Sequence, residues 1–243
     1  MQKTERRCLN CPYRSPLFNL LSDEELQMMY ENKITVKFNK GETIKKQGTI
    51  MTHVVSVNSG LAKLYLEGLD HKNAIIRIVK PTNFVGGSGI YLDQIHHYTL
   101  SALMDTTVCF IDINTFKEVI NGNKKFFEEF MKDFSRKSLA VYDRLISLTQ
   151  KQMPGRMADS LLYLYEDIFE GRRLDNHISN QDLAELSGMS KDSAVKTLRN
   201  FQNEGFISIS EHEIEILNYE ALQMIRKTNE RPDLRPAFYW FTG

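Results

Sequence analysis

ISNQDLAELSGMSKDSAVKTLRNFQNEGFISI, residues 178–209, is the stretch that decides the fold. Ser179 can cap the free backbone N–H groups of a helix over about residues 180–187. Gly188 then ends this helix, because glycine tolerates the left-handed conformation that lets the next helix leave at a steep angle. A second helix is predicted over about residues 191–203. Two short helices joined by a glycine turn are typical of a helix-turn-helix motif.

The second helix of this motif has one apolar face and one polar face. Ala194, Val195, Leu198 and Phe201 recur at helical spacing and should point inward. The outward face near the N-terminus is the part that a recognition helix inserts into the major groove of DNA. Ser190 can cap this helix, and we predict DNA contacts from Lys191, Asp192, Ser193, Lys196 and Arg199.

Two short alternating runs after the second helix predict a β-wing. Residues 206–209 follow Gly205, and residues 214–216 alternate again after a polar tetrapeptide. An ordinary pair of packed helices with a hairpin is the alternative interpretation of the helix pair by itself. The wing weighs against that alternative.

The region between residues 33 and 116 contains short alternating apolar runs separated by turns. Such runs at regular spacing predict a closed or rolled antiparallel sheet. The runs lie at residues 34–38, 54–57, 61–66, 74–79, 100–103 and 108–113, with the turn Gly86-Gly87-Ser88-Gly89 among them.

No glycine or proline occurs between residues 124 and 150, which predicts one long helix. Its apolar residues step by four and three in alternation, as in a heptad seam. A narrow seam suits a helix of a second chain, so we predict a parallel symmetric homodimer; packing of the stripe on the chain's own sheet is the alternative. The predicted interface residues are Phe127, Met131, Phe134, Val141, Leu145 and Leu148, with Ser138 as the weak point.

These elements predict an α+β fold in three parts. Residues 1–123 should form an antiparallel β-roll that acts as a sensor domain, and residues 124–151 the dimerisation helix. Residues 152–243 should form a winged helix-turn-helix domain. Because Pro154-Gly155 interrupts the chain, we expect a hinge near residues 152–155.

Length and composition are those of a globular chain with two cores. The 243 residues are 42% hydrophobic and 26% charged, and no apolar run is long enough for a membrane span. The charged N-terminus precedes no apolar segment, and the three cysteines are an odd number, so we expect a cytoplasmic location and reduced thiols.

The charge balance of the chain does not indicate a nucleic-acid partner. Net charge is zero, and from residue 152 onward 10 Lys and Arg stand against 15 Asp and Glu, a balance of −5. Phosphate neutralisation supplies most non-specific DNA affinity, so this balance argues against DNA binding. The local distribution of charge favours DNA binding, because Lys191, Lys196 and Arg199 share one predicted helix.

Several short motifs occur in a specific order along the chain. They are Asn39-Lys40-Gly41-Glu42, Ser59-Gly60, Lys80-Pro81-Thr82-Asn83-Phe84-Val85-Gly86, Leu148-Thr149-Gln150-Lys151 and residues 178–209. With the order of β-roll, long helix and winged helix-turn-helix, the chain resembles the Crp/Fnr family of bacterial transcription regulators over nearly its whole length. The general sequence pattern is most similar to that of family members from the Bacteroides group of bacteria.

This resemblance implies a cyclic-nucleotide-binding-like jelly roll, double-stranded DNA as a partner, and RNA polymerase as another. It implies phosphate contacts by Ser179, Asn180, Gln181, Ser190 and Ser193, and base-edge contacts by Lys191, Asp192 and Lys196. Lysine can donate to guanine, and aspartate can accept from cytosine. Family members commonly have Arg and Glu where Lys196 and Asp192 stand, so a borrowed operator sequence is in doubt.

In the cyclic-AMP receptors of the family, a Gly-Glu-Leu-Gly turn and a following Arg-Ser pair hold the nucleotide. Here residues 86–89 contain no glutamate and residues 96–99 contain no arginine. A cyclic phosphate would lack its charge-assisted bonds, so we expect a ligand other than cyclic AMP. The expected effector pocket comprises Gly86, Gly87, Ser88, His97 and Tyr98; turn geometry alone is the alternative reason for the glycines.

Cys8, Cys11 and Cys109 resemble three ligand positions of the oxygen-sensing branch of the family, which binds an iron–sulfur cluster. The Cys-x-x-Cys spacing of the first two suits one metal or cluster. The remaining ligand would fall near Leu17, which cannot coordinate. A buried structural thiol is the alternative for Cys109. The histidines lack helical metal spacing, so we expect them in solvent, with His96 and His97 on a loop tip and a haem ligand as the open alternative.

The sequence thus predicts a dimeric transcription regulator that binds a palindrome with half-sites about 34 Å apart. An enzyme is not expected, because no catalytic triad, phosphate loop or carboxylate pair is evident. The alternative is a small-molecule or redox-sensing module whose C-terminal domain contacts a protein, which the acidic balance favours.

Overall fold

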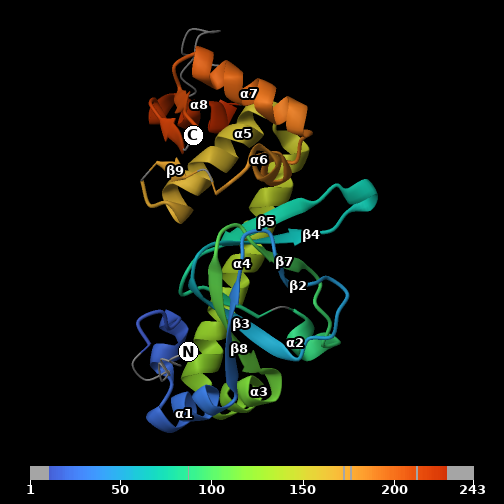
Figure 1. The fold of residues 1–243 in the computed structure, drawn as a ribbon, viewed down its shortest axis with the longest axis vertical. Helices are drawn as coiled ribbons and strands as arrows, with labels where there is room; N and C mark the ends of the chain where they lie inside the picture. Colours follow the sequence, from blue (N-terminus) through green and yellow to red (C-terminus); the bar gives the residue numbers. More distant parts are fainter. Residues whose placement is uncertain (1–10, 87, 172, 176, 212, 229–243) are drawn as a thin grey trace, which may run out of the picture. The chain divides into compact units, whose positions relative to one another are not determined.

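The structure is a computed structural model that describes residues 11–228 except 87, 172, 176 and 212. The chain divides into two compact units, Met1–Tyr142 and Asp143–Gly243, and the boundary falls inside the long helix α4 (Lys124–Gln150) (Figure 1). Within the described part of the chain, no helix combines the length and apolar character needed to cross a membrane.

The first unit contains two antiparallel four-stranded sheets, in the orders β1-β8-β3-β6 and β2-β7-β4-β5. The predicted rolled sheet is therefore confirmed, and the short strands β2 and β6 are additions. Its strands are β1 (Lys33–Phe38), β2 (Thr43–Lys45), β3 (His53–Ser59), β4 (Ala62–Leu66), β5 (Ala74–Val79), β6 (Phe84–Val85), β7 (Thr99–Ala102) and β8 (Thr106–Asp112). Its helices are η2 (Pro16–Leu20), α1 (Asp23–Glu31), η3 (Leu69–His71), α2 (Gly89–Leu92) and α3 (Ile113–Gly122).

Alternating side chains from both sheets fill the interior of the roll. Val57 of β3, Leu100 of β7 and Val108 of β8 are completely shielded from solvent, and they belong to one apolar cluster. Since successive side chains of a strand point to opposite faces, this alternation fixes the register of each pair. The apolar periodicity thereby determines which face of each strand is inside.

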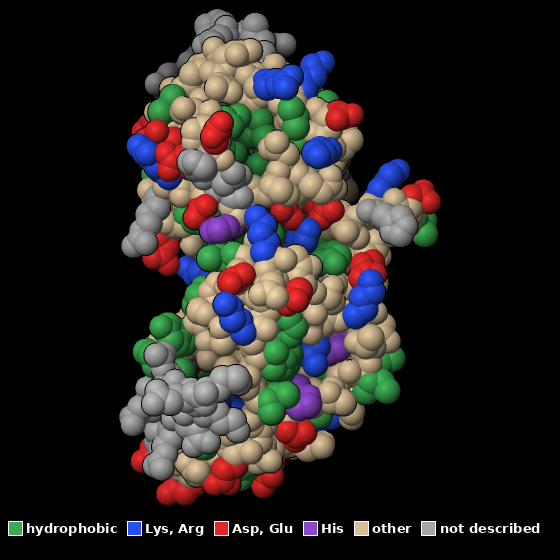
Figure 2. Space-filling view, in the orientation of Figure 1, with side chains coloured by type: hydrophobic (Ala, Val, Ile, Leu, Met, Phe, Trp, Pro, Cys, Tyr) green, Lys and Arg blue, Asp and Glu red, His purple; other side chains and the backbone are tan. Residues whose placement is uncertain are grey.

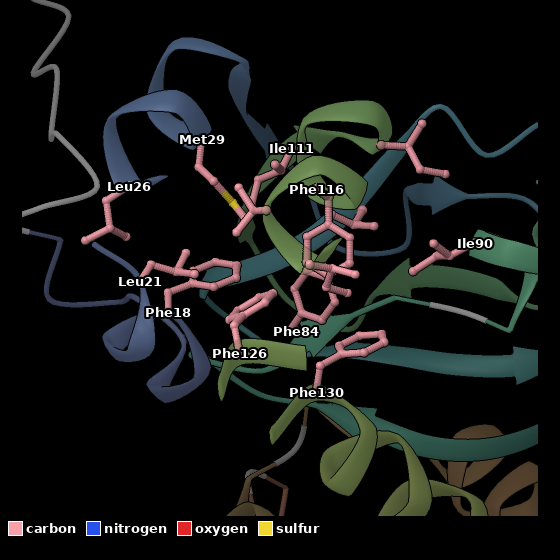
Figure 3. Packing of buried hydrophobic residues seen from close by; sticks show 14 of the residues in the cluster. Phe18, Leu21, Leu26, Met29, Phe84, Ile90, Ile111, Phe116, Phe126 and Phe130 are labelled. Carbon is pink, nitrogen blue, oxygen red and sulfur yellow. The ribbon is translucent and has the colours of Figure 1, made fainter. Parts of the chain in front are cut away.

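A second, aromatic core lies where α1, α3 and the start of α4 meet the roll (Figure 3). Phe116 is fully buried, and its ring lies 4.9 Å from that of Phe84, 5.9 Å from that of Phe126 and 5.6 Å from that of Phe130. Offset and edge-to-face ring pairs of this kind add to the burial free energy. This core holds the beginning of α4 against the first unit.

The heptad seam of α4 is largely uncovered within one chain. Phe127, Met131, Val141 and Leu145 are 40–58% exposed, while Phe134 and Leu148 are half-buried. The phenylalanines of α4 that pack on the chain's own core lie beside the seam, at positions 126 and 130. Leu139, Tyr142 and Ile146 are also exposed and widen the apolar face beyond the predicted stripe.

The second unit is built from helices and a small sheet. A three-stranded antiparallel sheet of order β10-β11-β9 confirms the predicted wing and adds β9 to it. Its elements after α4 are α5 (Met153–Tyr163), η4 (Leu164–Ile168), β9 (Leu174–Asp175), α6 (Asn180–Ser187), α7 (Lys191–Asn203), β10 (Ile207–Ile209), β11 (Glu213–Ile216) and α8 (Tyr219–Thr228).

Candidate DNA-binding surface

The turn between α6 and α7 has the geometry of a helix-turn-helix. Gly188 adopts a left-handed conformation with φ of 59°, as predicted from its position after α6. Ser179 caps α6: its hydroxyl accepts from the Asp182 backbone N–H at 3.1 Å and donates to the Asp182 carboxylate at 2.5 Å. Ser190 caps α7 by accepting from the Ser193 N–H at 3.2 Å. These caps fix where both helices begin.

Helix α7 presents its predicted contact residues to solvent. Lys191, Asp192, Lys196 and Arg199 are exposed, and within the described residues their side chains form no hydrogen bond or ion pair. On the opposite face, three of the four predicted inward residues are buried, and Val195 is half-buried. Long cationic side chains without partners remain available for an external anion or base edge.

The start of α6 lies at the same motif. Ser179, Asn180 and Gln181 are all exposed, and the Gln181 amide donates to Glu185 at 3.1 Å. Because the Ser179 hydroxyl is used in the capping box, backbone N–H groups remain as donors at this end. Backbone N–H groups at a helix N-terminus suit a phosphate oxygen.

A cation that the sequence did not single out neutralises part of the acidic wing. Arg173 donates to Glu213 at 2.5 Å and to Glu215 at 3.1 Å, and these carboxylates raise the pKa of the guanidinium. Glu213 and Glu215 are two positions apart on β11, so their side chains point to the same face of the strand and can contact one cation. This spacing is the sequence feature that could have indicated a shared partner. On the face shown in Figure 2, Lys and Arg side chains are interspersed with Asp and Glu.

The predicted effector-pocket residues have separate environments. Ser88 is exposed, His97 pairs with Asp93 at 3.1 Å, and Tyr98 packs against the core of the roll, where burial raises its pKa to about 12. A Cβ at Gly86 would lie 2.6 Å from the Phe84 ring, so packing requires this glycine. Gly87 lies outside the described residues.

A pocket of about 560 Å³ on this unit has a different lining from the predicted one. Among the expected residues that the structure describes, Gly86, Ser88, His97 and Tyr98 do not contribute to it. Its walls come from α2 and neighbouring segments, namely Ile50, Ile90, Tyr91, Leu92, Asp93, Gln94, Ile95 and Lys117.

His96 contradicts the prediction that both histidines of the pair lie in solvent. It is 2% exposed, and neither ring nitrogen has a hydrogen-bond partner in the described part of the chain. Burial lowers its pKa to about 4, and the positive charges of Lys45 and His97 contribute to the shift. The sequence shows two adjacent histidines between turns and gives no sign that one is enclosed.

The unfolding free energy is expected to decrease as pH falls from about 6.5 to 4. The folded-state pKa of His96 lies below the ordinary value of 6.5, so protons bind preferentially to the unfolded chain in this window. The loss is up to about 3 kcal/mol. Urea unfolding at several pH values measures it. His96→Gln should flatten this slope and His97→Gln should keep it; equal slopes in all three proteins would contradict the assignment.

The cysteines do not present a set of metal ligands in the described part of the chain. Cys109 is buried in β8, where its sulfur accepts from the Asn58 amide at 3.3 Å and lies 3.4 Å from the Thr35 hydroxyl. Cys11 is half-buried, and Cys8 lies outside the described residues. No group of three or more metal-ligating side chains occurs within 11–228 as described. These contacts favour the structural interpretation of Cys109.

Comparison with known proteins matches both units. Residues 35–123 match the cyclic nucleotide-binding domain, and residues 155–225 match the Crp-like helix-turn-helix domain. A CRP-like cAMP-activated global transcriptional regulator of Mycobacterium tuberculosis is 20% identical, covering 86% of this chain and 95% of the relative. The nitrogen fixation regulation protein FixK of Bradyrhizobium diazoefficiens is 23% identical, covering 87% and 90%.

Solved structures share the fold. A protein of the crp/fnr family from Eubacterium rectale has a TM-score of 0.73 at 21% identity, covering 88% of this chain and 98% of that one. FixK2 from Bradyrhizobium japonicum has a TM-score of 0.72 at 16% identity, covering 79% and 96%. The order of jelly roll, long helix and helix-turn-helix is therefore shared along most of the chain.

Proposed function

Because this chain belongs to the Crp/Fnr family of transcription regulators, we propose that it binds a palindromic operator as a homodimer. The family is non-enzymatic, and its regulators bind DNA and act as dimers with RNA polymerase. The observation that carries the proposal is the uncovered cationic N-terminal half of α7, with Lys191 and Lys196 free of internal partners. A recognition helix needs such side chains at the major groove.

The assignment of contacts follows the geometry of the two helix starts. We infer that Lys191, Asp192, Lys196 and Arg199 face base edges or adjacent phosphates. The capped starts of α6 and α7, at Ser179, Asn180, Gln181, Ser190 and Ser193, would contact phosphates. Backbone N–H groups there can donate hydrogen bonds to phosphate oxygens without a large local excess of Lys and Arg. This offsets the acidic balance of the domain.

The dimer half of the proposal is supported by the apolar face of α4. Seven large apolar side chains of this helix, from Phe127 to Ile146, are at least 40% exposed in one chain. An uncovered heptad stripe is the usual sign of a partner helix. Two chains joined there would present two α7 helices to half-sites about 34 Å apart.

The proposal also covers, in less detail, the signal that the protein senses and its location in the cell. We infer a cytoplasmic regulator whose β-roll senses a signal and which contacts RNA polymerase. Cyclic AMP is left out, because residues 86–89 and 96–99 lack the glutamate and arginine that the cyclic-AMP receptors use.

Lys196→Ala is expected to relax base preference at one operator position and cost about 1–3 kcal/mol in discrimination. The reason is loss of a donor to a base edge while the rest of α7 remains folded, since Lys196 is exposed. A duplex selected by the wild-type protein from a random pool, with single-base variants of it, provides the measurement. Lys227→Ala, a change outside the motif, serves as the control. Unchanged base preference in Lys196→Ala would remove this residue from the interface.

Salt dependence separates DNA binding from the alternative of a protein-contacting C-terminal domain. If phosphates are contacted, the logarithm of the affinity falls steeply and linearly with the logarithm of salt concentration. Absence of any selected duplex, or a flat salt dependence, would favour the protein-contacting alternative.

A further inference from the structure

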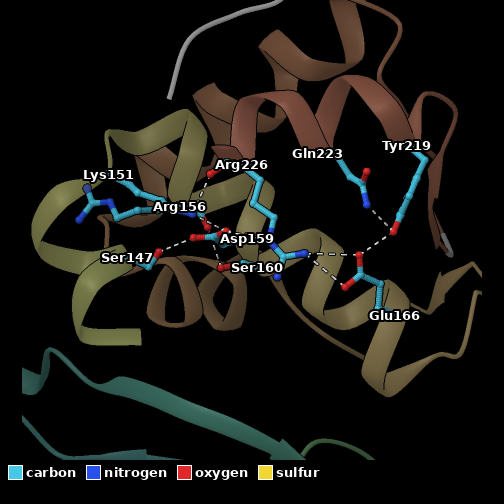
Figure 4. Close-up of polar contacts among 9 residues, drawn as sticks. All are labelled: Ser147, Lys151, Arg156, Asp159, Ser160, Glu166, Tyr219, Gln223 and Arg226. Atoms are coloured by element: carbon cyan, nitrogen blue, oxygen red, sulfur yellow. Dashed lines mark hydrogen bonds and ion pairs between the residues drawn. The ribbon is translucent and has the colours of Figure 1, made fainter. Parts of the chain in front are cut away.

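The junction between α4 and α5 is bridged by one carboxylate. Ser147, near the end of α4, donates its hydroxyl proton to Asp159 Oδ2 at 2.5 Å, and Lys151 Nζ donates to Asp159 Oδ1 at 2.8 Å. Asp159 itself lies on α5 (Figure 4). Its side chain is 15% exposed, and Ser147 is 5% exposed. Hydrogen bonds this well shielded from water are stronger than surface pairs.

The same carboxylate extends the connection to the last helix. Arg226 Nε of α8 lies 3.3 Å from Asp159 Oδ1, and Lys151 Nζ also donates to the Arg226 carbonyl at 2.8 Å. Arg226 further pairs with Glu166 at 3.3 Å, and the Tyr219 hydroxyl donates to Glu166 at 2.8 Å. Three helices, α4, α5 and α8, therefore meet at Asp159 (Figure 4).

The end of α4 also contacts the helix-turn-helix turn directly. A Cβ at Gly188 would lie 2.4 Å from Leu148 Cδ2, so the leucine packs against the glycine. Arg156 of α5 donates to the Gly188 carbonyl at 3.1 Å. Movement of the last turn of α4 thus bears on the turn that orients α7.

Charge makes Asp159 the sensitive point of this network. It faces the cations Lys151 and Arg226, and it also stabilises the charge of Arg144, whose pKa burial lowers. Removing the carboxylate leaves the partly buried Lys151 without its counter-charge, while Arg226 keeps its pair with Glu166. Removing Glu166 affects Arg226 and Tyr219 of α8, with which it pairs.

We propose that Asp159 is a positioning residue that fixes the C-terminal end of α4 to the DNA-binding unit. The proposal rests on the proposed function, because its consequence is a set distance between two operator-bound α7 helices. The expected hinge at residues 152–155 is bridged by these contacts.

Operator spacing provides the test. A duplex selected by the wild-type protein is compared with versions that have one base pair added or removed at the dyad, a shift of about 3.4 Å. We expect the wild-type protein to lose at least about tenfold in affinity and Asp159→Asn less than about threefold, because a looser tether accommodates both spacings. Base preference within each half-site should remain, since α7 is unchanged.

Lys151→Met provides a second variant, which removes the tether from the α4 side and should relax spacing in the same way. Glu166→Gln is the matched control, a carboxylate of the same network that pairs with α8, and it should retain the wild-type spacing profile. A variant that is merely less stable would lose affinity for all duplexes equally. An unchanged spacing profile in folded Asp159→Asn would overturn the proposal while leaving DNA binding intact.

Hydrogen exchange tests the tether without DNA. Amide exchange over residues 144–150 should accelerate in Asp159→Asn and in Lys151→Met, and stay at the wild-type rate in Glu166→Gln. If the wild-type protein selects no palindrome, the proposed function fails and this measurement still decides the tether. Equal exchange in all four proteins would overturn it.

Discussion

Leu145→Glu is expected to yield a folded monomer that binds a palindromic duplex at least about 100-fold more weakly than the wild-type protein. Leu145 is 58% exposed in one chain and lies near the C-terminal end of the uncovered stripe of α4. In a symmetric seam the new carboxylates of both chains would approach each other and lose water. Each half-site contact would then have to form separately.

Sedimentation equilibrium gives the oligomeric state, and gel shifts on the selected duplex and on an isolated half-site give the affinities. Affinity for the half-site should change little, because Leu145 is not part of the helix-turn-helix. Ala140→Glu introduces the same charge at an exposed position on the opposite face of α4 and should remain dimeric. A dimeric Leu145→Glu protein with full operator affinity would exclude the seam as the interface.

Local sequence signals determined much of the second unit. Serine at each helix start and Gly188 at the turn act through neighbouring backbone groups, so the bounds of α6 and α7 follow from adjacent residues. The long strands of the roll follow from alternation over several residues. Strands β2, β6 and β9 have only two or three residues each, which is too short for a period to be recognised.

Contacts between distant residues were not predictable from one sequence. Asp159 joins Ser147, Lys151 and Arg226, which are 12, 8 and 67 positions away, and no local pattern pairs them. His96 was expected in solvent because the histidine pair was placed on a loop tip and lacks helical metal spacing, yet the fold encloses it. The close packing at Gly86 and Gly89 likewise involves residues that no local pattern pairs with them, namely Ile90 and Ile95.

The adjacent phenylalanines of α4 show the same limit. A step of four and three selects Phe127 for the seam, and it does not reveal that Phe126 and Phe130 belong to the chain's own core. When one face of a helix packs on the chain's own core and a second face packs on another chain, both faces carry apolar residues. The sequence pattern alone does not distinguish them.

Phe126→Ala is expected to lower the unfolding free energy by about 3–5 kcal/mol, a large part of the total stability of a typical domain. Phe126 is fully buried, and its ring lies 6.1 Å from that of Phe18 and 5.9 Å from that of Phe116, so truncation leaves a cavity in the aromatic core. Urea unfolding followed by circular dichroism measures the change.

Phe127→Ala is the matched control, because it removes the same side chain from the next position of the same helix. Phe127 is 44% exposed, so in the Leu145→Glu background its truncation should cost about 1 kcal/mol or less. In the wild-type background it should instead weaken dimerisation, which makes the unfolding midpoint more dependent on protein concentration. Equal losses for both substitutions in the monomeric background would mean that α4 is rotated about its axis relative to the packing described, and that Phe127 belongs to the core.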